Sequence, residues 1–499
     1  MAELSLAQIP DILRNAGLLT GEGPFPKEDR AAVELVTDHR LLQKKQGAVF
    51  LAIRGGSFDG HTVLDRLPAH SASLVIGEDD QTLQNCGLPW LQVSSSRAAW
   101  SWLAAAASGN PQAHLQCFGI TGTNGKTSTV WLIRELLRLR GESCLTIGTT
   151  GAVLDDQTFD TGHTTPDPPR LFALLAKAVQ AGVRYVAMEV SSHALMQEKT
   201  GPLRFAAVAL TSFSRDHLDY HGSMDDYLGA KWRLFGLLKR PDNPCLISSD
   251  ARSYGRPGPL PAGARWIGMG EGDADIRVEC TSYGPPVCRY RISGAGDERS
   301  GALPLIGDWQ VLNFAIAFLL VEGVAGPGPV DNSGLHPVPG RMEPVGHTAA
   351  GPWVYVDYAH TPDALQKALA LLRHAGQGRL LLVFGCGGDR DTGKRPEMGR
   401  VAAALADRII VTSDNPRSED PEKIIRAITA GLSGHKDWDA VTDRRAAIRR
   451  ALREAGPGDR VLIAGKGHED YQEIRGRRLP FDDRLVVADY LGRGKGAGP

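Results

Sequence analysis

Short apolar runs alternate with longer amphipathic segments through most of the chain. Residues 1–110 mix strand-like runs, such as 47–55 and 73–79, with modest helical patterns. From 111 to 336 the alternation of strand and helix is more regular, and it resumes after residue 342. Because this alternation is typical of parallel sheets covered by helices, the pattern predicts an α/β fold.

The chain is long enough to form several hydrophobic cores. At ~150 residues per domain, its 499 residues suggest about three domains. The Gly- and Pro-rich segment GVAGPGPVDNSGLHPVPGR, at 323–341, is typical of a linker. We therefore predict a small N-terminal α/β domain over 1–110, a central parallel sheet over 111–336 and a Rossmann-like C-terminal sheet over 337–499.

Composition and charge exclude several classes of protein. The chain is 42% hydrophobic and 23% charged, as in soluble globular proteins, and its net charge of -1 would not recruit nucleic acid or an anionic membrane. We find neither a signal peptide nor an apolar run long enough to span a membrane. We expect a cytoplasmic protein without a nucleic-acid partner or membrane insertion. The seven cysteines form no CxxC pair and are expected to be reduced thiols: Cys86, Cys117, Cys144, Cys245, Cys280, Cys288 and Cys386.

A glycine-rich loop between a strand pattern and a helix pattern indicates a nucleotide site. In GITGTNGKTST, at 119–129, Gly122 and Gly125 leave room for backbone N–H groups to approach phosphate oxygens. Lys126 supplies a positive charge, and Thr127 supplies a hydroxyl for Mg²⁺. The GxxGKT spacing is two residues shorter than the common phosphate loop, and a Gly-rich turn with an incidental lysine is the alternative. Because strand, loop and helix stand in the required order, we predict a P-loop that binds ATP in the central sheet.

Acidic, histidine and lysine side chains follow two later strands of the central sheet. Glu189 ends one strand, where a carboxylate is well placed to bind Mg²⁺. The segment 212–235 contains two histidines and several acids, but their spacing is not that of a closed zinc site. In the same segment, Lys231 stands beside Trp232 and Phe235. Lys231 is either a surface lysine with its stem on apolar side chains or a desolvated lysine that is partly neutral and reactive.

In the second half, polar residues follow four successive strand patterns. Asp357 and His360 follow the first, the Gly-rich loop 384–396 the second, and Asp414 to Arg417 the third. The fourth ends in AGKGHEDY, at 464–471. Because ligands of open α/β sheets bind beyond the carboxyl ends of the strands, we predict a polar substrate site there and expect the two sheets to face one cleft. The turn DNPR holds an acid, an amide and a guanidinium, a set suited to a zwitterion.

With these motifs in place, the sequence resembles the Mur ligase family over nearly the whole chain, and most strongly its diaminopimelate-adding branch. The motifs that carry the resemblance are GTNGKT, MEVSSH, SRDHLDYHGSMDDYLGAK, GRMEPV, VDYAHTPDAL, FGCGGDRDTGKRP, DNPR and AGKGHEDY. The resemblance implies ATP-dependent amide formation in peptidoglycan synthesis. ATP would phosphorylate the D-glutamyl γ-carboxylate of UDP-N-acetylmuramoyl-L-alanyl-D-glutamate, and an amine of meso-2,6-diaminopimelate would attack the acyl phosphate.

The resemblance also implies roles for individual residues. Lys126, Glu189, His217 and Lys231 are the expected catalytic residues, and Thr127, Glu189, His217 and Lys231 the expected Mg²⁺ ligands, Lys231 as a carbamate derived from CO₂. The expected ATP-binding residues are Gly122, Thr123, Asn124, Gly125, Lys126, Thr127, Ser128, Asn313, Arg341, Asp357 and His360. The residues expected to bind the UDP-muramyl-dipeptide are Thr37, His39, Thr164, Thr165, Ser191, Gln197 and Lys199. Those expected to bind diaminopimelate are Arg390, Asp414, Asn415, Pro416, Arg417, Gly465 and Glu469. Domains 1–110, 111–336 and 337–499 would bind the UDP-substrate, ATP and the amino acid, in a monomer.

The resemblance gives DNPR a meaning. The far end of diaminopimelate is a zwitterion, so Arg417 can pair with its carboxylate while Asp414 and Glu469 suit its ammonium. Lysine lacks that carboxylate and would leave Arg417 unpaired, which is how a site discriminates strongly.

The sequence departs from the family pattern mainly on the uridine side. Asp38-His39-Arg40 stands where many members have DSR, and Gly56-Ser57 precedes Phe58 where a His-Gln pair is usual. Lys199 replaces a frequent arginine, and GDWQVLNFA, at 307–315, replaces the usual Phe-Asn motif. An unusual acceptor carboxylate therefore stays open, as does a lysine-adding ligase. A plain P-loop kinase would leave DNPR without a role. A silent binding protein would leave the retained Lys126, Glu189 and Lys231 without one.

Overall fold

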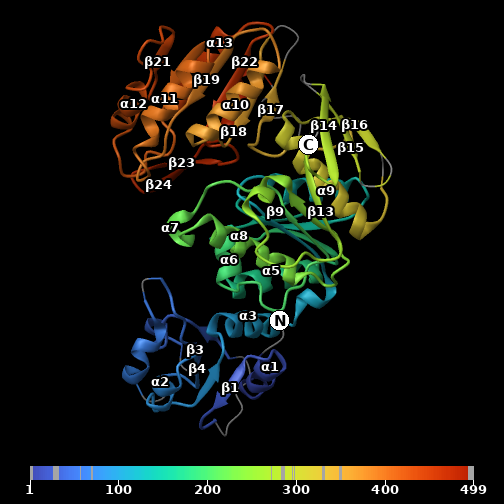
Figure 1. The fold of residues 1–499 in the computed structure, drawn as a ribbon. Coiled ribbons are helices and arrows are strands. Elements are labelled where there is room, and N and C mark those ends of the chain that lie inside the picture. Colours follow the sequence, from blue (N-terminus) through green and yellow to red (C-terminus); the bar gives the residue numbers. More distant parts are fainter. Residues whose placement is uncertain are drawn as a thin grey trace. The chain divides into compact units, whose positions relative to one another are not determined.

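The computed structural model describes residues 4–25, 33–45, 47–56, 58–68, 71–270, 272–282, 287–294, 296, 298–328, 332–347 and 351–492. Within them the chain is an α/β protein, as predicted (Figure 1). It divides into two compact units, of which the first comprises residues 1–268, 272–275 and 316–328. The second comprises residues 269–271, 276–315 and 329–499.

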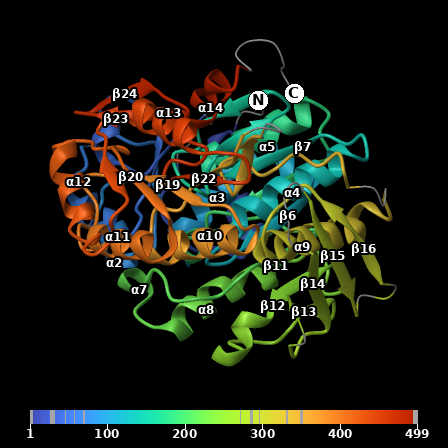
Figure 2. The same ribbon diagram turned by 90° about the horizontal axis from the view of Figure 1, so that it is seen from above.

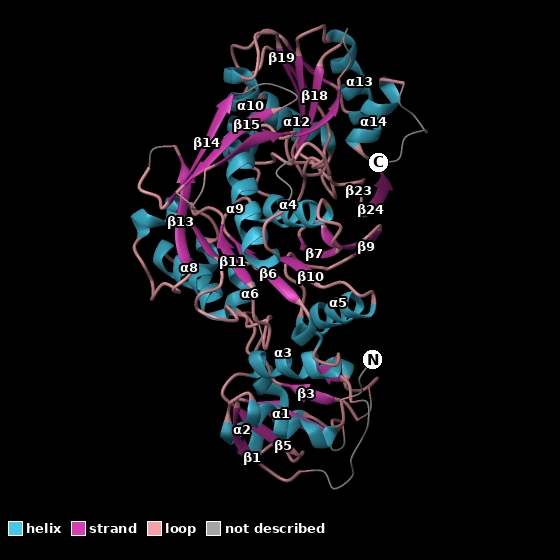
Figure 3. Cartoon of the chain, turned by 90° about the vertical axis from the view of Figure 1, so that its right-hand side faces the viewer, coloured by secondary structure: helices cyan, strands magenta, loops and turns pink. Residues whose placement is uncertain are grey.

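The first unit begins with a small mixed sheet in the order β1-β5-β4-β3-β2. One face packs on α1 (Ile9–Asn15) and α3 (Ser96–Ala107), and the other on the segment around α2 (Asp80–Gln84), so strand side chains alternate between two cores (Figure 3). The strands are β1 (Leu19–Glu22), β2 (Leu35–Val36), β3 (Val49–Leu51), β4 (Leu74–Gly77) and β5 (Trp90–Val93).

A larger sheet follows in the same unit, in the order β13-β12-β11-β6-β10-β7-β8-β9. From β13 to β7 its strands pair in parallel, with Glu189 opposite Ile120 and Leu210 opposite Thr121. The loops that follow β6, β10 and β11 therefore leave the same edge. The strands are β6 (Gln116–Thr121), β7 (Cys144–Gly148), β8 (Gly151–Leu154), β9 (Gln157–Phe159), β10 (Tyr185–Glu189), β11 (Ala207–Leu210), β12 (Cys245–Ser248) and β13 (Ala264–Met269). The helices are α4 (Lys126–Arg138), α5 (Pro168–Gln180), α6 (Ser192–Met196), α7 (Leu218–His221) and α8 (Met224–Trp232).

In the second unit, a sheet in the order β17-β18-β22-β19-β20-β21 is parallel except at β17. Helices α10 and α11 cover one face, and α13 and α14 the other (Figure 2). The strands are β17 (Glu343–Gly346), β18 (Trp353–Asp357), β19 (Leu380–Phe384), β20 (Arg408–Val411), β21 (Trp438–Ala440) and β22 (Arg460–Ala464), and β23 (Tyr471–Ile474) and β24 (Arg477–Pro480) form a hairpin. The helices are α10 (Pro362–His374), α11 (Lys394–Leu405), α12 (Pro421–Thr429), α13 (Arg444–Glu454) and α14 (Asp483–Tyr490).

The parallel register of this sheet brings the predicted strand-end residues to one edge. Ala464 lies opposite both Asp357 and Phe384, and Phe384 lies opposite Val411. The loops after β18, β19, β20 and β22 therefore begin side by side. The prediction that these four strand ends share an edge is confirmed.

The second unit also contains an antiparallel hairpin system, β14 (Ile276–Ser282), β15 (Cys288–Ser293) and β16 (Arg299–Leu303). Here the structure corrects the prediction of seven free thiols, because Cys280 and Cys288 form a disulfide between β14 and β15. Neighbouring antiparallel strands bring two cysteine side chains within bonding reach, which their separation in sequence did not reveal. The other five cysteines are free and buried.

Helix α9 (Asp308–Ala325) includes the first three residues of the segment predicted as a linker, 323–341, so the helix continues further than the Gly and Pro content suggested. Among the helices of the described residues, α9 is the one long and apolar enough to cross a membrane. However, 56% of that window is buried inside the protein, as in the core helix of a soluble protein.

Candidate functional site

The predicted phosphate loop joins β6 to α4. Gly122 has a φ of 147°, and an added Cβ would collide with the Thr211 hydroxyl, so the chain needs glycine here. The Lys126 ammonium donates to the carbonyl oxygens of Gly122 at 2.8 Å and Thr123 at 3.0 Å. The loop is also tied to the strand-end segment after β11, since the backbone N–H of Asn124 donates to the Ser212 hydroxyl at 2.9 Å. The amide groups at the start of a 13-residue helix and a lysine charge thus gather at one loop, as phosphate binding requires.

Glu189 is a buried carboxylate at the end of β10, with a side chain held by hydroxyl and amide donors. The Thr127 hydroxyl donates to Oε1 at 2.9 Å, and the backbone N–H of Thr149 donates to the same atom at 2.8 Å. The Thr149 hydroxyl reaches Oε2 at 3.2 Å. The phosphate-loop hydroxyl and the strand-end carboxylate, predicted as partners from separate motifs, therefore lie in direct contact.

Lys231 is only 2% exposed and lies at the phosphate loop. Its ammonium donates to the Gly122 carbonyl oxygen at 3.0 Å and lies 4.3 Å from the ring centre of Tyr227. Burial, reinforced by the charge of Lys126, lowers the pKa of Lys231 well below its usual value. The structure therefore supports the desolvated interpretation of Lys231 over that of a surface lysine.

His217 is exposed, with a φ of 51°, and belongs to an aromatic cluster rather than to the Glu189 network. Its ring centre lies 5.0 Å from that of His193, and among the described residues no hydrogen bond joins it to Thr127 or Glu189. Nearby, His221 shares a hydrogen bond of 2.9 Å with the Ser192 hydroxyl. Burial and the charges of neighbouring histidines and Lys231 lower the pKa of His221 to about 4.

Two groups of residues expected on the UDP-muramyl side lie in different parts of the first unit. Thr165 and Ser191 lie beside Glu189, because the Thr165 hydroxyl donates to the Glu189 carbonyl oxygen at 2.9 Å and accepts from the Ser191 N–H at 3.1 Å. The Thr164 hydroxyl lies 3.1 Å from that of Thr149, and Lys199 forms an ion pair with Asp167 at 2.8 Å. Gln197 ends α6.

The remaining group belongs to the small N-terminal sheet. Thr37 precedes a turn in which the Arg40 guanidinium holds the pKa of Asp38 down at about 2. The His39 ring stacks on Phe58 with centres 5.5 Å apart. Ser57, part of the altered motif, lies outside the described residues.

The other residues expected around ATP belong to the second unit or to α9, which carries the buried Asn313. Asp357, at the end of β18, accepts the backbone N–H groups of Met342 at 2.7 Å and Ala359 at 2.8 Å. Burial raises the pKa of Asp357, and the charge of Arg341 opposes that rise. Arg341 itself lies over the Tyr358 ring at 4.6 Å. His360 is exposed, and its carbonyl oxygen accepts from Lys394 at 2.9 Å.

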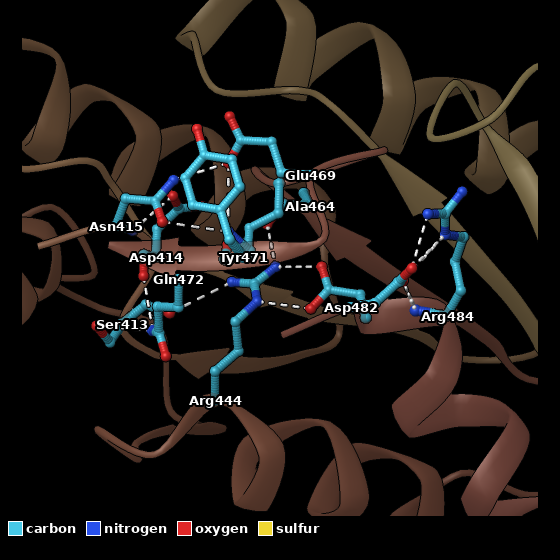
Figure 4. Close-up of polar contacts among 12 residues, drawn as sticks. Ser413, Asp414, Asn415, Arg444, Ala464, Glu469, Tyr471, Gln472, Asp482 and Arg484 are labelled. Atoms are coloured by element: carbon cyan, nitrogen blue, oxygen red, sulfur yellow. Dashed lines mark hydrogen bonds and ion pairs between the residues drawn. The ribbon is translucent and has the colours of Figure 1, made fainter. Parts of the chain in front are cut away.

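The DNPR turn follows β20 and is held by residues that follow β22 (Figure 4). Asp414 Oδ1 accepts the Asn415 N–H at 2.7 Å, and Asn415 Nδ2 donates to Glu469 Oε2 at 2.7 Å. Gly465, with a φ of 116°, passes so close to Asp414 Oδ2 that any side chain there would collide with it. Asp414, Asn415, Gly465 and Glu469 therefore form one cluster, as the sequence predicted.

Arg417, after Pro416 in the turn, has a φ of 51°, an unusual conformation for a residue with a side chain. Its backbone pairs with the β23 hairpin, and its Nη1 donates to the Gly388 carbonyl oxygen at 2.6 Å. Its Nε lies 3.7 Å from Glu473 Oε2. Arg390 lies on the adjacent Gly-rich loop and is exposed. The guanidinium of Arg417 thus lies between the Gly388 carbonyl oxygen and the Glu473 carboxylate, and the Arg417 side chain is about three-quarters buried.

Three supporting interactions were not predicted from the sequence. Thr149, after β7, completes the Glu189 network. The fully buried Arg444 forms a bidentate ion pair with Asp483 at 2.7 and 2.8 Å. Its guanidinium also donates to the Ala464 carbonyl oxygen at the end of β22 (Figure 4). Lys466, also fully buried, contacts both Asn415 and Glu469. Thr149 and Lys466 both follow a strand end, a signal that could have found them, whereas Arg444 follows an ordinary helix cap and carried no signal.

The donor set around Glu189 fits Mg²⁺. A hard divalent cation prefers oxygen ligands, usually one or two carboxylates with phosphate oxygens and water, and Glu189 and Thr127 supply a carboxylate and a hydroxyl beside the phosphate loop. Among the described residues there is no cluster of three His, Cys, Asp or Glu side chains that could hold a metal ion.

Comparison with known proteins agrees with this geometry. Residues 120–321 match the Mur ligase middle domain, and residues 340–467 match the Mur ligase glutamate ligase domain. The chain belongs to the Mur ligase family. As a Mur ligase it is an ATP-dependent enzyme that forms an amide bond, and the predicted fold, family and class of reaction are confirmed.

Two curated relatives illustrate the likeness. The chain is 42% identical to the UDP-N-acetylmuramoyl-L-alanyl-D-glutamate–2,6-diaminopimelate ligase of Alkalilimnicola ehrlichii over 94% of this chain and 97% of the relative. It is 41% identical to the ligase of the same name from Parasynechococcus marenigrum, over 95% and 96%. A solved structure of a ligase with that name superposes with a TM-score of 0.67 at 30% identity, over 99% of this chain and all of the other.

Proposed function

We propose that this chain joins meso-2,6-diaminopimelate to the D-glutamyl γ-carboxylate of UDP-N-acetylmuramoyl-L-alanyl-D-glutamate during cytoplasmic assembly of the peptidoglycan precursor. The observation that carries the proposal is the strand-end cluster of Asp414, Asn415, Gly465 and Glu469, with Arg417 two residues after Asn415 in the same turn. We propose that the two carboxylates and the Arg417 guanidinium bind one ligand. The names of the similar ligases support the same substrates. The proposed division of labour is a UDP-substrate domain over 1–110, an ATP domain over 111–336 and an amino-acid domain over 337–499.

The first step proposed is activation of the carboxylate. An oxygen of the D-glutamyl γ-carboxylate attacks the terminal phosphorus of ATP, the bond to the bridging oxygen breaks, and ADP leaves. The resulting acyl phosphate has a good leaving group that the free carboxylate lacks. Lys126, at the phosphate loop, offsets charge on the transferring phosphoryl group, and the loop amides hold the remaining phosphates.

The second step is amide formation. The neutral amine of the amino acid attacks the acyl carbon, a tetrahedral intermediate forms, and the carbon–oxygen bond to phosphate breaks. The amine nitrogen loses a proton, and inorganic phosphate leaves. In this step the strand-end cluster holds the far end of the amino acid, so that only the reacting amine is free to reach the acyl phosphate.

We propose that Mg²⁺ binds Thr127 and Glu189, with His217 as a further ligand, and neutralises phosphate charge when ATP is bound. Lys231 is proposed to be carbamylated. Burial lowers the pKa of Lys231 and so favours the neutral amine, which would attack the carbon of CO₂, form an N–C bond and release a proton, leaving a carboxylate-like group. Carbamylation would thus replace the positive charge of Lys231, beside the phosphate loop, with a negative charge able to assist metal binding.

The far end of diaminopimelate fits the charges of the cluster. Its carboxylate would pair with the Arg417 guanidinium, and its ammonium would lie near Asp414 and Glu469. L-lysine has no carboxylate at that end and would leave the partly buried Arg417 guanidinium without a substrate carboxylate to pair with, at a large cost in affinity. The second candidate function is the same ligation on a different acceptor carboxylate, and the observation that favours it is the His39–Phe58 stack in the altered uridine-side segment.

The proposal is tested by measuring phosphate release and ligated product with ATP, Mg²⁺ and UDP-N-acetylmuramoyl-L-alanyl-D-glutamate, with meso-diaminopimelate or L-lysine offered in parallel. We expect product with diaminopimelate and at least about a hundredfold lower kcat/KM with lysine. Product with lysine at a comparable rate would contradict the proposed role of Arg417. No product with either amine, in a folded chain that binds ATP, would contradict the proposed acceptor.

A further inference from the structure

Lys466 lies just beyond β22, and its side chain is fully buried beneath the strand-end cluster. Its ammonium has three N–H donors. One donates to Asn415 Oδ1 at 3.2 Å, another to Glu469 Oε2 at 3.2 Å, and the third to the backbone carbonyl oxygen of Tyr471. Because all three donors are used inside the protein, Lys466 has none left for a ligand.

These bonds fix the orientation of the Asn415 amide. Its Oδ1 accepts from Lys466 and also from the backbone N–H of Glu473 at 2.9 Å. A flipped amide would place its NH₂ group against an ammonium and a backbone N–H, both of which are donors. The amide therefore keeps its Nδ2 toward Glu469 Oε2, at 2.7 Å.

Glu469 is in turn held through one of its two oxygens. Both Asn415 and Lys466 donate to Oε2, and within the part of the chain that the structure describes no hydrogen bond is made to Oε1. The side chain is 18% exposed, so Oε1 is within reach of a ligand. Asp414 shows the same asymmetry, because Oδ1 accepts the Asn415 N–H and Oδ2 lies beside the bare backbone of Gly465.

We propose that Lys466 is a positioning residue for amino-acid recognition. It sets the Asn415 amide and pins Glu469 Oε2, so that Glu469 Oε1 is presented to the ammonium group at the far end of the amino-acid substrate. A carboxylate held in advance at one oxygen loses little side-chain entropy when it binds an ammonium with the other. This inference rests on the proposed diaminopimelate-adding function.

The same strand offers a matched control. Arg460 is the first residue of β22, and Lys466 comes just after its last residue. Both side chains are buried cations that donate to backbone carbonyl oxygens. Arg460 donates to the carbonyl oxygens of Leu372 and Gly376 at 2.6 Å, at the sheet edge opposite the cluster. Arg460→Met therefore removes a buried cation from the same sheet without touching the proposed site.

The test compares the wild-type chain, Lys466→Met and Arg460→Met with diaminopimelate and with 2-aminopimelate, which keeps both carboxylates but lacks the far amino group. For Lys466→Met we expect KM for diaminopimelate to rise about tenfold or more while KM for ATP stays within about twofold. The wild-type preference for diaminopimelate over 2-aminopimelate should largely disappear in Lys466→Met and persist in Arg460→Met. A purely structural role would lower activity toward both amino acids equally.

The outcomes separate this inference from the proposed function. No turnover of diaminopimelate by the wild-type chain overturns both. Turnover by the wild-type chain, with an unchanged preference in a folded Lys466→Met variant, overturns only the positioning role. If Lys466→Met does not fold, Lys466→Gln, which keeps a donor without the charge, takes its place. Failure of both to fold while Arg460→Met folds would assign Lys466 to domain stability and overturn the inference.

Discussion

At the scale of single residues, the site depends on side chains whose state is set by their surroundings. Lys231 is a lysine with a strongly lowered pKa because it is buried beside a second lysine, and Arg417 is held about three-quarters buried with positive φ. The residue types at these positions were evident from the sequence. Their burial was not, because it depends on helices and loops that are distant along the chain.

Arg417→Lys should weaken amino-acid binding without affecting nucleotide use. A lysine keeps the positive charge but loses the planar pair of donors that matches a carboxylate. We expect KM for diaminopimelate to rise about 10- to 100-fold, with KM for ATP within about twofold. Steady-state kinetics with each substrate varied in turn measures this. Arg475→Lys is the matched control, because Arg475 is an exposed arginine with a φ of 49° on the adjacent hairpin. Equal effects of the two changes would contradict the assignment.

His221 should make stability depend on pH. Its pKa in the folded state is about 4, so between that value and its usual 6.5 the unfolded chain binds a proton that the folded chain does not. Its effect is absent above pH 6.5, and the free energy of unfolding falls as the pH drops toward 4. Between pH 7.0 and pH 4.5, the free energy of unfolding measured with urea should fall by about 1–2 kcal/mol less in His221→Gln than in the wild type. His374→Gln, a change at a surface histidine, should leave the decrease as it is. If His221→Gln has no effect, the low pKa is wrong.

At the scale of elements, parallel strands place their ends in register, and a few buried cations hold those ends together. Arg444 begins α13, forms an ion pair with Asp483 at the start of α14, and donates to the last carbonyl oxygen of β22. The element pattern itself was predictable, since apolar strands and amphipathic helices alternate. The contact between the starts of α13 and α14, at Arg444 and Asp483, was not predictable. Each residue follows an aspartate that reads only as an ordinary N-terminal cap.

Arg444→Met should destabilise the second unit and disturb the proposed amino-acid site together. Loss of Arg444 leaves Asp483 buried without its partner, which costs about 3–5 kcal/mol, and frees the strand end from which Gly465 and Glu469 follow. Urea unfolding and kinetics for diaminopimelate would show both effects. Arg408→Met is the control, because Arg408 is a buried arginine with carboxylate partners at the start of β20, away from the site. It should reduce stability with little change in KM. A normal KM in folded Arg444→Met would contradict the link between this ion pair and the site.

At the scale of the whole molecule, the residues assigned to the two steps belong to different compact units. The phosphate loop, Glu189 and Lys231 lie in the first unit, and the DNPR turn and Glu469 lie in the second. The sequence places these motifs on either side of the Gly- and Pro-rich segment 323–341, and the division into domains 1–110, 111–336 and 337–499 stays a prediction. That the two sheets face one cleft stays a prediction.

Variants in the two units should therefore fail at different steps. With hydroxylamine in place of the amino acid, an acyl phosphate is trapped as a hydroxamate, so the first step is measured alone. We expect Lys126→Met to lower hydroxamate formation about a thousandfold or more, because a charge at the transferring phosphoryl is lost. Arg417→Ala should form hydroxamate within about threefold of the wild type and still fail to join diaminopimelate. Loss of hydroxamate in Arg417→Ala would contradict the separation of roles.

The sequence by itself determined the fold class and the family, and it named the loops that we propose carry the chemistry. Strand and helix periodicity, glycine spacing and strand-end polar residues are local signals that survive in the linear chain. The tertiary structure decided which partners those residues meet: Thr149 at Glu189, Tyr227 at Lys231, Lys466 at Asn415 and Asp483 at Arg444. It also joined Cys280 to Cys288, against the prediction of free thiols. The physical reason is that parallel register and helix packing bring together side chains from separate segments, and burial then fixes their charges and orientations.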